Sequence, residues 1–116
     1  GAASDDSLSL AYERFWRLSS PPRLDFVLRP PRQSGDRVEL WLDRSYLHDV
    51  NVTSVTPEPQ SVRTGSARLH YAFALAEAGV PIAVTLEIEP ARPWLLQGQA
   101  GMTGAGSVAF SQFVYP

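Results

Sequence analysis

The sequence predicts an all-β protein: a two-layer antiparallel β-sandwich, immunoglobulin-like, with eight or nine short strands and one short helical turn. Seven or more segments alternate apolar and polar residues, and Pro, Gly, Asp and Asn separate nearly all of them. Successive side chains of a strand point to opposite faces, so this alternation describes strands with one buried face and one wet face. A single sheet cannot hide its apolar face alone, so we expect a second sheet to pack against it.

One domain accounts for residues 7–116, because a chain of 116 residues fits a single domain with its own core. Residues 1–6 are small and acidic, and we expect a flexible lead-in or a remnant of cloning there. There is no cysteine and no lysine, which excludes thiolate chemistry, a Schiff-base lysine and a P-loop lysine. The net charge of −2 is mixed along the chain, so no basic stripe is available for nucleic acid. We expect no cofactor.

The first strand is expected over residues 7–18, which alternate at first and then become aromatic with flanking arginines, so that a bulge fits there. Ser19-Ser20-Pro21-Pro22 ends it. Residues 23–29 and 37–42 form the next two strands, and a proline pair ends the first of them. Proline cannot donate to a strand ladder, so such pairs mark strand ends well. With a loose polar loop between the strands, residues 24–42 are predicted to form a β-hairpin.

The helical turn is predicted over residues 43–49. Asp43 is an N-cap acid, and about one turn of helix follows it. We expect Tyr46, Leu47 and Val50 to close one end of the sandwich.

The rest of the chain is predicted to form further strands. Residues 67–76 are ambiguous, because their alanines suit a helix while bulky residues at every second position suit a strand; we predict a strand. The glycine-rich segment 101–107 is predicted to be a turn rather than a phosphate cradle, since a strand and not a helix follows it. The other strands are predicted at residues 50–56, 60–64, 82–89, 94–100 and 108–115.

Candidate catalytic groups are few. Ser45, His48 and Asp49 lie within one helical turn, where the histidine cannot bridge the other two as a triad requires, so we interpret them as part of a capped turn. The two histidines, His48 and His70, lie on different elements without cysteine, and we predict no metal site. His70 takes the outer phase of its strand, where it would be solvated.

A carboxylate pair offers a weaker catalytic alternative. Glu87 and Glu89 are two apart on one predicted strand, so they point the same way, about 7 Å apart by strand rise. That separation suits an inverting glycosidase. Leu86 and Ile88 take the core phase, however, so we expect both acids on the wet face. There they would discourage edge association.

Tryptophans beside arginines are the best remaining lead. Exposed tryptophan and arginine are typical of protein interfaces, and such residues also stack on sugar rings or pack at lipid surfaces. Trp41 lies between Leu40 and Leu42, which places it on the outer face if those leucines are inside. The structural alternative is that both faces are covered, or that arginine stems lie over the rings. The predicted interaction surface consists of Arg14, Trp16, Arg17, Trp41, Arg92 and Trp94.

Several phrases of the chain resemble a group of small, uncharacterised bacterial membrane-anchored proteins. These phrases are Phe110–Pro116 at the end, Tyr12–Phe15, Leu40–Leu42 with Ser45–Leu47, and Thr56–Pro59. The resemblance covers most of the chain and carries no known activity, so it assigns no functional residue. It implies a location: the outer side of the bacterial membrane, tethered by a helix that is not in this sequence.

The sequence therefore predicts a non-catalytic, extracytoplasmic interaction domain that contacts a protein partner or an identical copy. We expect contact with the membrane only through the anchor. The alternatives are a carbohydrate- or small-ligand-binding module that uses the same tryptophans and a two-carboxylate hydrolase that uses Glu87 and Glu89.

Overall fold

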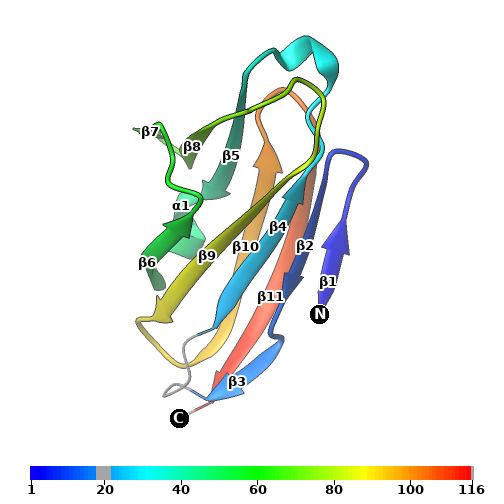
Figure 1. Ribbon diagram of the computed structural model, residues 1–116. Coiled ribbons are helices and arrows are strands. Elements are labelled where there is room, and N and C mark those ends of the chain that lie inside the picture. The colour runs from blue at the N-terminus through cyan, green and yellow to red at the C-terminus, as the bar shows by residue number, and fades with distance from the viewer. Residues whose placement is uncertain (18–21, 116) are drawn as a thin grey trace.

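A computed structural model describes residues 1–17 and 22–115 of the chain (Figure 1). These residues form eleven strands, where we expected eight or nine, and two short helices, η1 (Arg32–Ser34) and α1 (Arg44–Leu47). No helix of the described residues is long enough and apolar enough to cross a bilayer. The strands are β1 (Ala2–Ser4), β2 (Leu8–Tyr12), β3 (Phe15–Arg17), β4 (Arg23–Leu28), β5 (Arg37–Asp43), β6 (Val50–Thr56), β7 (Ser61–Thr64), β8 (Arg68–Ala74), β9 (Ile82–Pro90), β10 (Trp94–Met102) and β11 (Ser107–Tyr115).

The strands build two packed sheets, which confirms the predicted all-β sandwich. The first sheet has the order β1-β2-β4-β9-β6 and the second the order β3-β11-β10-β5-β8-β7. All pairs are antiparallel except β3 and β11, which run parallel. The inward side chains of both sheets form one hydrophobic core, in which Phe26 and Leu86 of the first sheet and Leu40, Phe73 and Leu96 of the second are fully buried or nearly so.

Seven of the strands occupy the positions of strands in an immunoglobulin-like sandwich, but the chain passes through the middle strands in a different order. β2, β4, β9 and β6 occupy the places of strands A, B, E and D, while β11, β10 and β5 occupy those of G, F and C. The chain then departs from that order. It visits β6, in the first sheet, before it returns to the second sheet for β7 and β8.

The predicted strand over residues 7–18 is wrong as one strand. β2 belongs to the first sheet and β3 to the second, so the chain changes sheets at Glu13 and Arg14. Leu8, Leu10 and Trp16 are buried, and a continuous strand would turn Arg14 to the same inward side. Burying an unpaired arginine is costly, and the crossing leaves Arg14 exposed. The predicted end of this strand at residues 19–22 lies mostly outside the described residues.

The predicted hairpin over residues 24–42 is also wrong. β4 pairs with β2 and β9 in the first sheet, whereas β5 pairs with β10 and β8 in the second. The segment between them, which contains η1, therefore carries the chain from one layer to the other. Alternation identifies the buried faces of β4 and β5 correctly, but it does not say whether two such faces lie side by side or oppose each other across the core.

The first residues of the chain form strand β1, where we expected a flexible lead-in. β1 pairs antiparallel with β2, with Ala2 opposite Ala11 and Ser4 opposite Ser9. Asp5 closes the turn, because its Oδ1 accepts hydrogen bonds from the backbone N–H of Ser7 at 2.9 Å and from its hydroxyl at 2.8 Å. These bonds lower the pKa of Asp5. Aspartate that bonds the backbone two residues on is a common turn former.

The helical turn and the ambiguous segment both follow the prediction. Asp43 caps α1 and accepts a hydrogen bond from the Tyr46 backbone N–H at 3.3 Å. Tyr46 is fully buried, Val50 is buried, and Leu47 packs partly buried against the same core. Residues 68–74 of the ambiguous segment form strand β8 between β5 and β7.

Candidate functional site

Trp16 is not part of an exposed surface. It is 5% exposed and lies in the core between the sheets. Trp16 is the inward residue of β3, and its neighbours Phe15 and Arg17 face outward. Its Nε1 has no hydrogen-bond acceptor in the part of the chain that the structure describes.

Trp41 has the predicted orientation but not the predicted exposure. It lies on the outer face of the second sheet, between the buried Leu40 and Leu42, and is only 3% exposed. The Arg68 guanidinium covers its ring, with the central carbon 3.8 Å from the ring centroid. Gly101 lies opposite Trp41 in the register, and the indole fills the space that a side chain at this position would need. As the alternative to exposure, the sequence allowed that an arginine side chain covers the ring, and this alternative is correct for Trp41.

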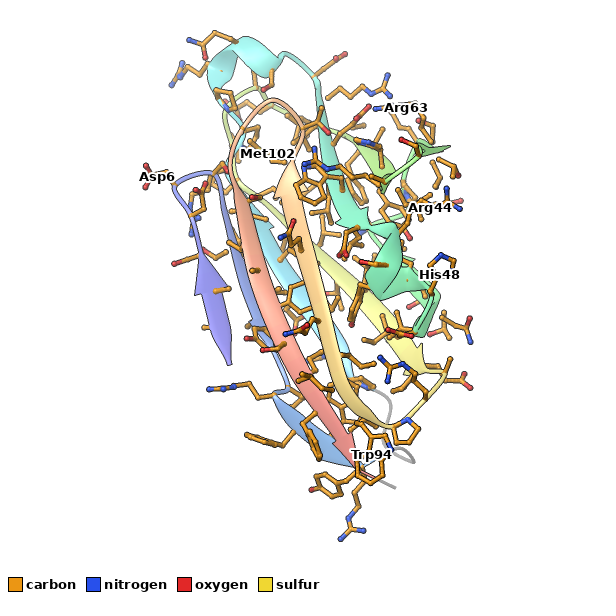
Figure 2. All side chains as sticks on the ribbon, turned by 180° about the vertical axis from the view of Figure 1, so that it is seen from behind. Asp6, Arg44, His48, Arg63, Trp94 and Met102 are labelled. Carbon is orange, nitrogen blue, oxygen red and sulfur yellow. The ribbon has the colours of Figure 1, made fainter. Side chains whose placement is uncertain are left out.

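Exposed apolar side chains gather instead at one end of the second sheet. β3, the start of β10 and the end of β11 meet there, and Figure 2 shows Trp94 at that extremity. We call this surface the aromatic end. Phe15 is 64% exposed, Trp94 54%, Leu95 48% and Tyr115 37%. The aromatic end consists of Phe15, Trp94, Leu95, Phe113 and Tyr115.

The strand register makes the aromatic end continuous. Leu95 is opposite Phe113, and Phe113 is opposite Phe15, so the three side chains form a row across three strands on the outer face. The ring of Phe113 lies 6.5 Å from that of Phe15 and 6.0 Å from that of Trp94, centroid to centroid. Sequence reasoning found only Trp94 of this group. The sequence did contain a signal for the others: Phe113 and Tyr115 flank the core residue Val114, so the alternation of β11 turns both rings toward solvent.

Trp94 owes its outward position to its backbone. It is opposite the buried Val114, so a regular strand would turn it inward. Its φ of 84° lies in the left-handed region, which residues other than glycine rarely adopt. This backbone conformation interrupts the inward–outward alternation of β10 at Trp94. Such strain persists only where the surroundings hold it.

Arg92 holds the turn before Trp94 rather than forming a contact surface. Its Nε and one terminal nitrogen donate to the two carboxylate oxygens of Asp49 at 2.8 and 3.1 Å. The same terminal nitrogen reaches the carbonyl of Leu95 at 3.3 Å, on the far side of Trp94. Hydrogen bonding from Arg92 lowers the pKa of Asp49, which keeps the pair charged.

Arg14 and Arg17 flank the aromatic end. The guanidinium carbon of Arg14 lies 5.9 Å from the centroid of Phe15, and that of Arg17 lies 5.4 Å from the centroid of Tyr115. Both are within the range in which cations are attracted to ring faces. The ion pairs found among the described residues involve other arginines. The two guanidinium groups therefore lie beside exposed rings with their charge uncompensated by a carboxylate of those residues.

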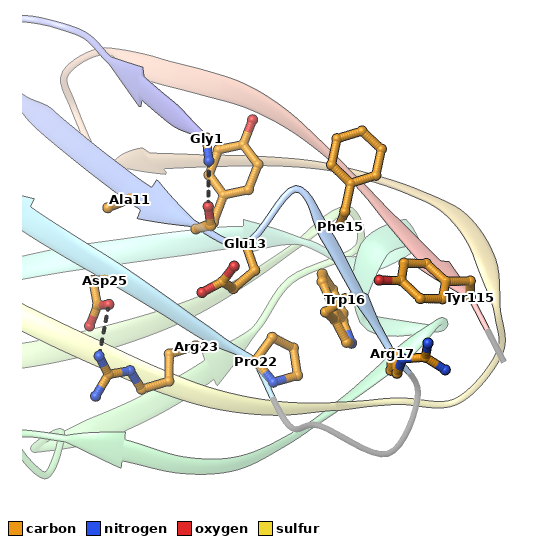
Figure 3. A pocket seen from close by; sticks show the side chains of 11 residues that line it. Gly1, Ala11, Glu13, Phe15, Trp16, Arg17, Pro22, Arg23, Asp25 and Tyr115 are labelled. Carbon is orange, nitrogen blue, oxygen red and sulfur yellow. Dashed lines mark hydrogen bonds and ion pairs between the residues drawn. The ribbon is translucent and has the colours of Figure 1, made fainter.

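An open hollow of about 620 Å³ lies beside β3, at the point where the chain passes from the first sheet to the second (Figure 3). Trp16 forms part of its wall, and another part comes from Pro22 and from Arg23 and Asp25 of β4. Arg23 and Asp25 lie 3.7 Å apart, and both are substantially exposed. Figure 3 shows Glu13 in the hollow, away from the ring of Phe15. The lining is partly polar and partly apolar and is open to solvent. Among the described residues, no buried charged groups converge on a common point in it.

The candidate triad is a set of structural contacts. The Ser45 hydroxyl donates to the helix-capping carboxylate of Asp43, and Asp49 is occupied by Arg92. Glu87 and Glu89 are both exposed on the outer face of the first sheet, which confirms their predicted orientation. Ser45 lines an open hollow together with Asp43 and Gln97, but His48 and Asp49 do not, so the three candidate groups do not share one cleft.

His70 is not solvated as predicted, because it belongs to a polar cluster around Glu39. The Glu39 Oε1 accepts hydrogen bonds from Thr103 at 3.1 Å and Arg63 at 3.2 Å, and the His70 Nδ1 lies 3.3 Å from it. The Glu39 Oε2 lies 3.4 Å from Arg37. One and the same nitrogen of His70 faces Thr103, at 3.2 Å, and Glu39, so the imidazole does not bridge hydroxyl and acid as a general base would.

This cluster predicts a small acid-sensitive contribution to stability. Burial raises the pKa of Glu39, but the hydrogen bonds from Thr103 and Arg63 and the positive charges nearby outweigh it, and the pKa lies below the ordinary value of 4.5. A lowered folded-state pKa stabilises the protein above the unfolded-state pKa, and this contribution is lost as the pH falls through the folded-state value.

We therefore expect E39Q to lower the melting temperature at pH 7 by an amount that corresponds to less than about 1 kcal/mol, because the cluster is partly exposed. The gap between variant and wild type should close when thermal melts are repeated below pH 4. E87Q, which changes an exposed glutamate of the other sheet, is the control. A gap that stays constant from pH 7 to pH 3 would contradict the role given to the ionised Glu39.

The fold defines the class of this protein as a two-sheet β-sandwich. No protein-family model matches the chain, and no curated protein matches it at a significant level.

Proposed function

We propose that this chain is a non-catalytic interaction domain whose working surface is the aromatic end. The observation that carries the proposal is the row of exposed side chains across β10, β11 and β3, together with Trp94, whose left-handed backbone turns its ring outward. Contiguous apolar surface on a soluble domain is unfavourable unless another molecule covers it, so such patches mark contact sites. Aromatic residues and arginine are also the residues that dominate contact surfaces.

We further propose that the domain works on the outer side of the bacterial membrane as part of a membrane-anchored protein. The support for this location is the resemblance of its sequence phrases to such proteins. Protease added to intact spheroplasts that produce the full-length protein should cleave or release the domain. Protection of the domain until the membrane is permeabilised would contradict the proposed location.

A photo-crosslinking experiment tests the working surface without knowledge of the partner. The photoreactive residue p-benzoylphenylalanine replaces Phe15, which is 64% exposed at the aromatic end. In the control it replaces Val27, which is 38% exposed on β4 of the other sheet. We expect illumination of producing cells to give an adduct from position 15 and little or none from position 27. Equal adducts from the two positions, or none from position 15, would refute the aromatic end as the working surface.

Carbohydrate binding is the second candidate function. Phe15, Trp94 and Tyr115 are exposed aromatic side chains at one end of the molecule, and aromatic rings can stack on sugars. A saturable rise in melting temperature with one glycan of a panel, absent in W94S, would favour this function over macromolecular contact. The sequence expectation of self-association is tested separately by light scattering after gel filtration.

A further inference from the structure

We propose that the aromatic end docks on an anionic lipid surface. This inference rests on the proposed function, and it names the partner of that same surface. It goes beyond the sequence expectation, in which the membrane is reached only through an anchor.

The charges of the aromatic end favour a negatively charged partner. Arg14 and Arg17 lie beside the exposed rings of Phe15 and Tyr115, whereas Arg92 is neutralised by Asp49. Two acids line the hollow beside β3: Asp25 is paired with Arg23, and Glu13 lies away from the ring of Phe15 (Figure 3). The exposed rings are therefore flanked by positive charge, although the whole chain has a net charge of −2. Basic groups beside anionic headgroups are attracted within about a Debye length.

The same charges disfavour a second copy. Two copies that meet through this surface about a two-fold axis bring the same patch of each together. Arg14 and Arg17 of one copy would then approach those of the other, and like charges brought together across an interface oppose association.

The side-chain types match the boundary between lipid headgroups and acyl chains. Tryptophan and tyrosine are enriched at that depth, where an apolar ring and a polar edge are both accommodated, and arginine reaches the headgroups. Phe15 and Leu95 supply purely apolar area beside them. The patch lies at one end of a molecule with extents of 44 × 25 × 22 Å, so it can insert while the rest of the sandwich stays in water.

The test uses vesicles of phosphatidylcholine alone and vesicles with equal parts phosphatidylglycerol. We expect the protein to co-sediment with the anionic vesicles and not with the neutral ones, and rising salt should release it. Tryptophan fluorescence should shift to the blue on binding. Trp16 and Trp41 are buried and Trp94 is exposed, so the shift should vanish in W94F while co-sedimentation persists.

Two variants separate the charge from the rings. R14Q/R17Q should weaken the partition onto anionic vesicles about thirtyfold, since each basic residue near such a surface contributes about a factor of five. R37Q/R63Q is the matched control, because it removes the same net charge from the cluster around Glu39 at the opposite end. F15S/W94S should weaken partition tenfold or more through lost apolar contact. Circular dichroism and thermal melts establish that each variant is folded.

The outcomes distinguish this inference from the proposed function. Equal binding to both vesicle types, no binding to either, or equal loss in R14Q/R17Q and R37Q/R63Q would overturn lipid docking. If position 15 then still gives a crosslinked adduct whose mass is that of a protein or of a second copy, the aromatic end remains a contact surface with a different partner. A lipid adduct from position 15 supports the inference directly.

Discussion

Replacing Gly101 by alanine should strongly destabilise the protein, because the indole of Trp41 occupies the space that the new methyl group would need. A Cβ at Gly101 would lie 2.5 Å from carbon atoms of the Trp41 ring, far inside van der Waals contact. Moving the ring would also disturb its contact with the Arg68 guanidinium, which lies over it. Overpacking of this kind costs about 1–3 kcal/mol, which a urea titration of G101A should show as a fall in the free energy of unfolding.

Two further variants assign the cause. In W41L/G101A the smaller side chain removes the clash, so the double variant should lose less than the sum of the two single variants, a coupling that a double-mutant cycle measures. G104A provides the backbone comparison, since Gly104 has a φ of 80° but open space around it. It should cost about 1–2 kcal/mol through strain alone, without coupling to Trp41. A G101A protein as stable as the wild type would refute the described packing of Trp41.

Tyr46→Phe should cause the second large loss, about 1–3 kcal/mol, because it leaves a buried acceptor without its donor. The Tyr46 hydroxyl donates to the Gln112 Oε1 at 2.7 Å, and both residues are at most 1% exposed. Burial, reinforced by the charge of Asp43, raises the pKa of Tyr46 far above its ordinary value of 10. The hydroxyl therefore stays protonated and remains a donor in the folded protein.

A double variant and an alkaline titration check this interpretation. Y46F/Q112M replaces both polar partners by apolar groups and should regain much of the stability that Y46F loses. The raised pKa also fixes a direction with pH. Above pH 10 the unfolded chain ionises Tyr46 and the folded chain does not, so the wild type should lose stability there more steeply than Y46F. Equal slopes for the two proteins above pH 10 would contradict the described burial.

The alternation of apolar and polar residues correctly predicts which side of a strand is buried. In β9, for example, Val84, Leu86 and Ile88 face the core while Glu87 and Glu89 are exposed, as the alternation predicts. Side-chain period is a local property, and one strand is enough to express it. Which strands become neighbours depends on pairings far apart in the chain, so the hairpin over 24–42 and the single first strand were wrong.

The candidate site could be predicted only in part, for a related reason. Trp94, Arg14 and Arg17 were among the predicted surface residues, and they do lie at the aromatic end. Trp16 and Trp41 were not separable from them by sequence, because the cover of Trp41 comes from Arg68 and Gly101 on two other strands. The outward position of Trp94 depends on a left-handed φ, which neither its residue type nor its strand phase reveals.

The parallel pairing of β3 with β11 has a consequence for synthesis of the chain. Phe15 meets Phe113, and Arg17 meets Tyr115, so residues almost a hundred positions apart complete the same surface. Contacts this distant form late, after the more local ones. During translation β3 therefore emerges long before its partner β11 exists, with Phe15 and Trp16 uncovered. The aromatic end is complete only when β11 has left the ribosome, so a polypeptide that stops before β11 lacks this surface.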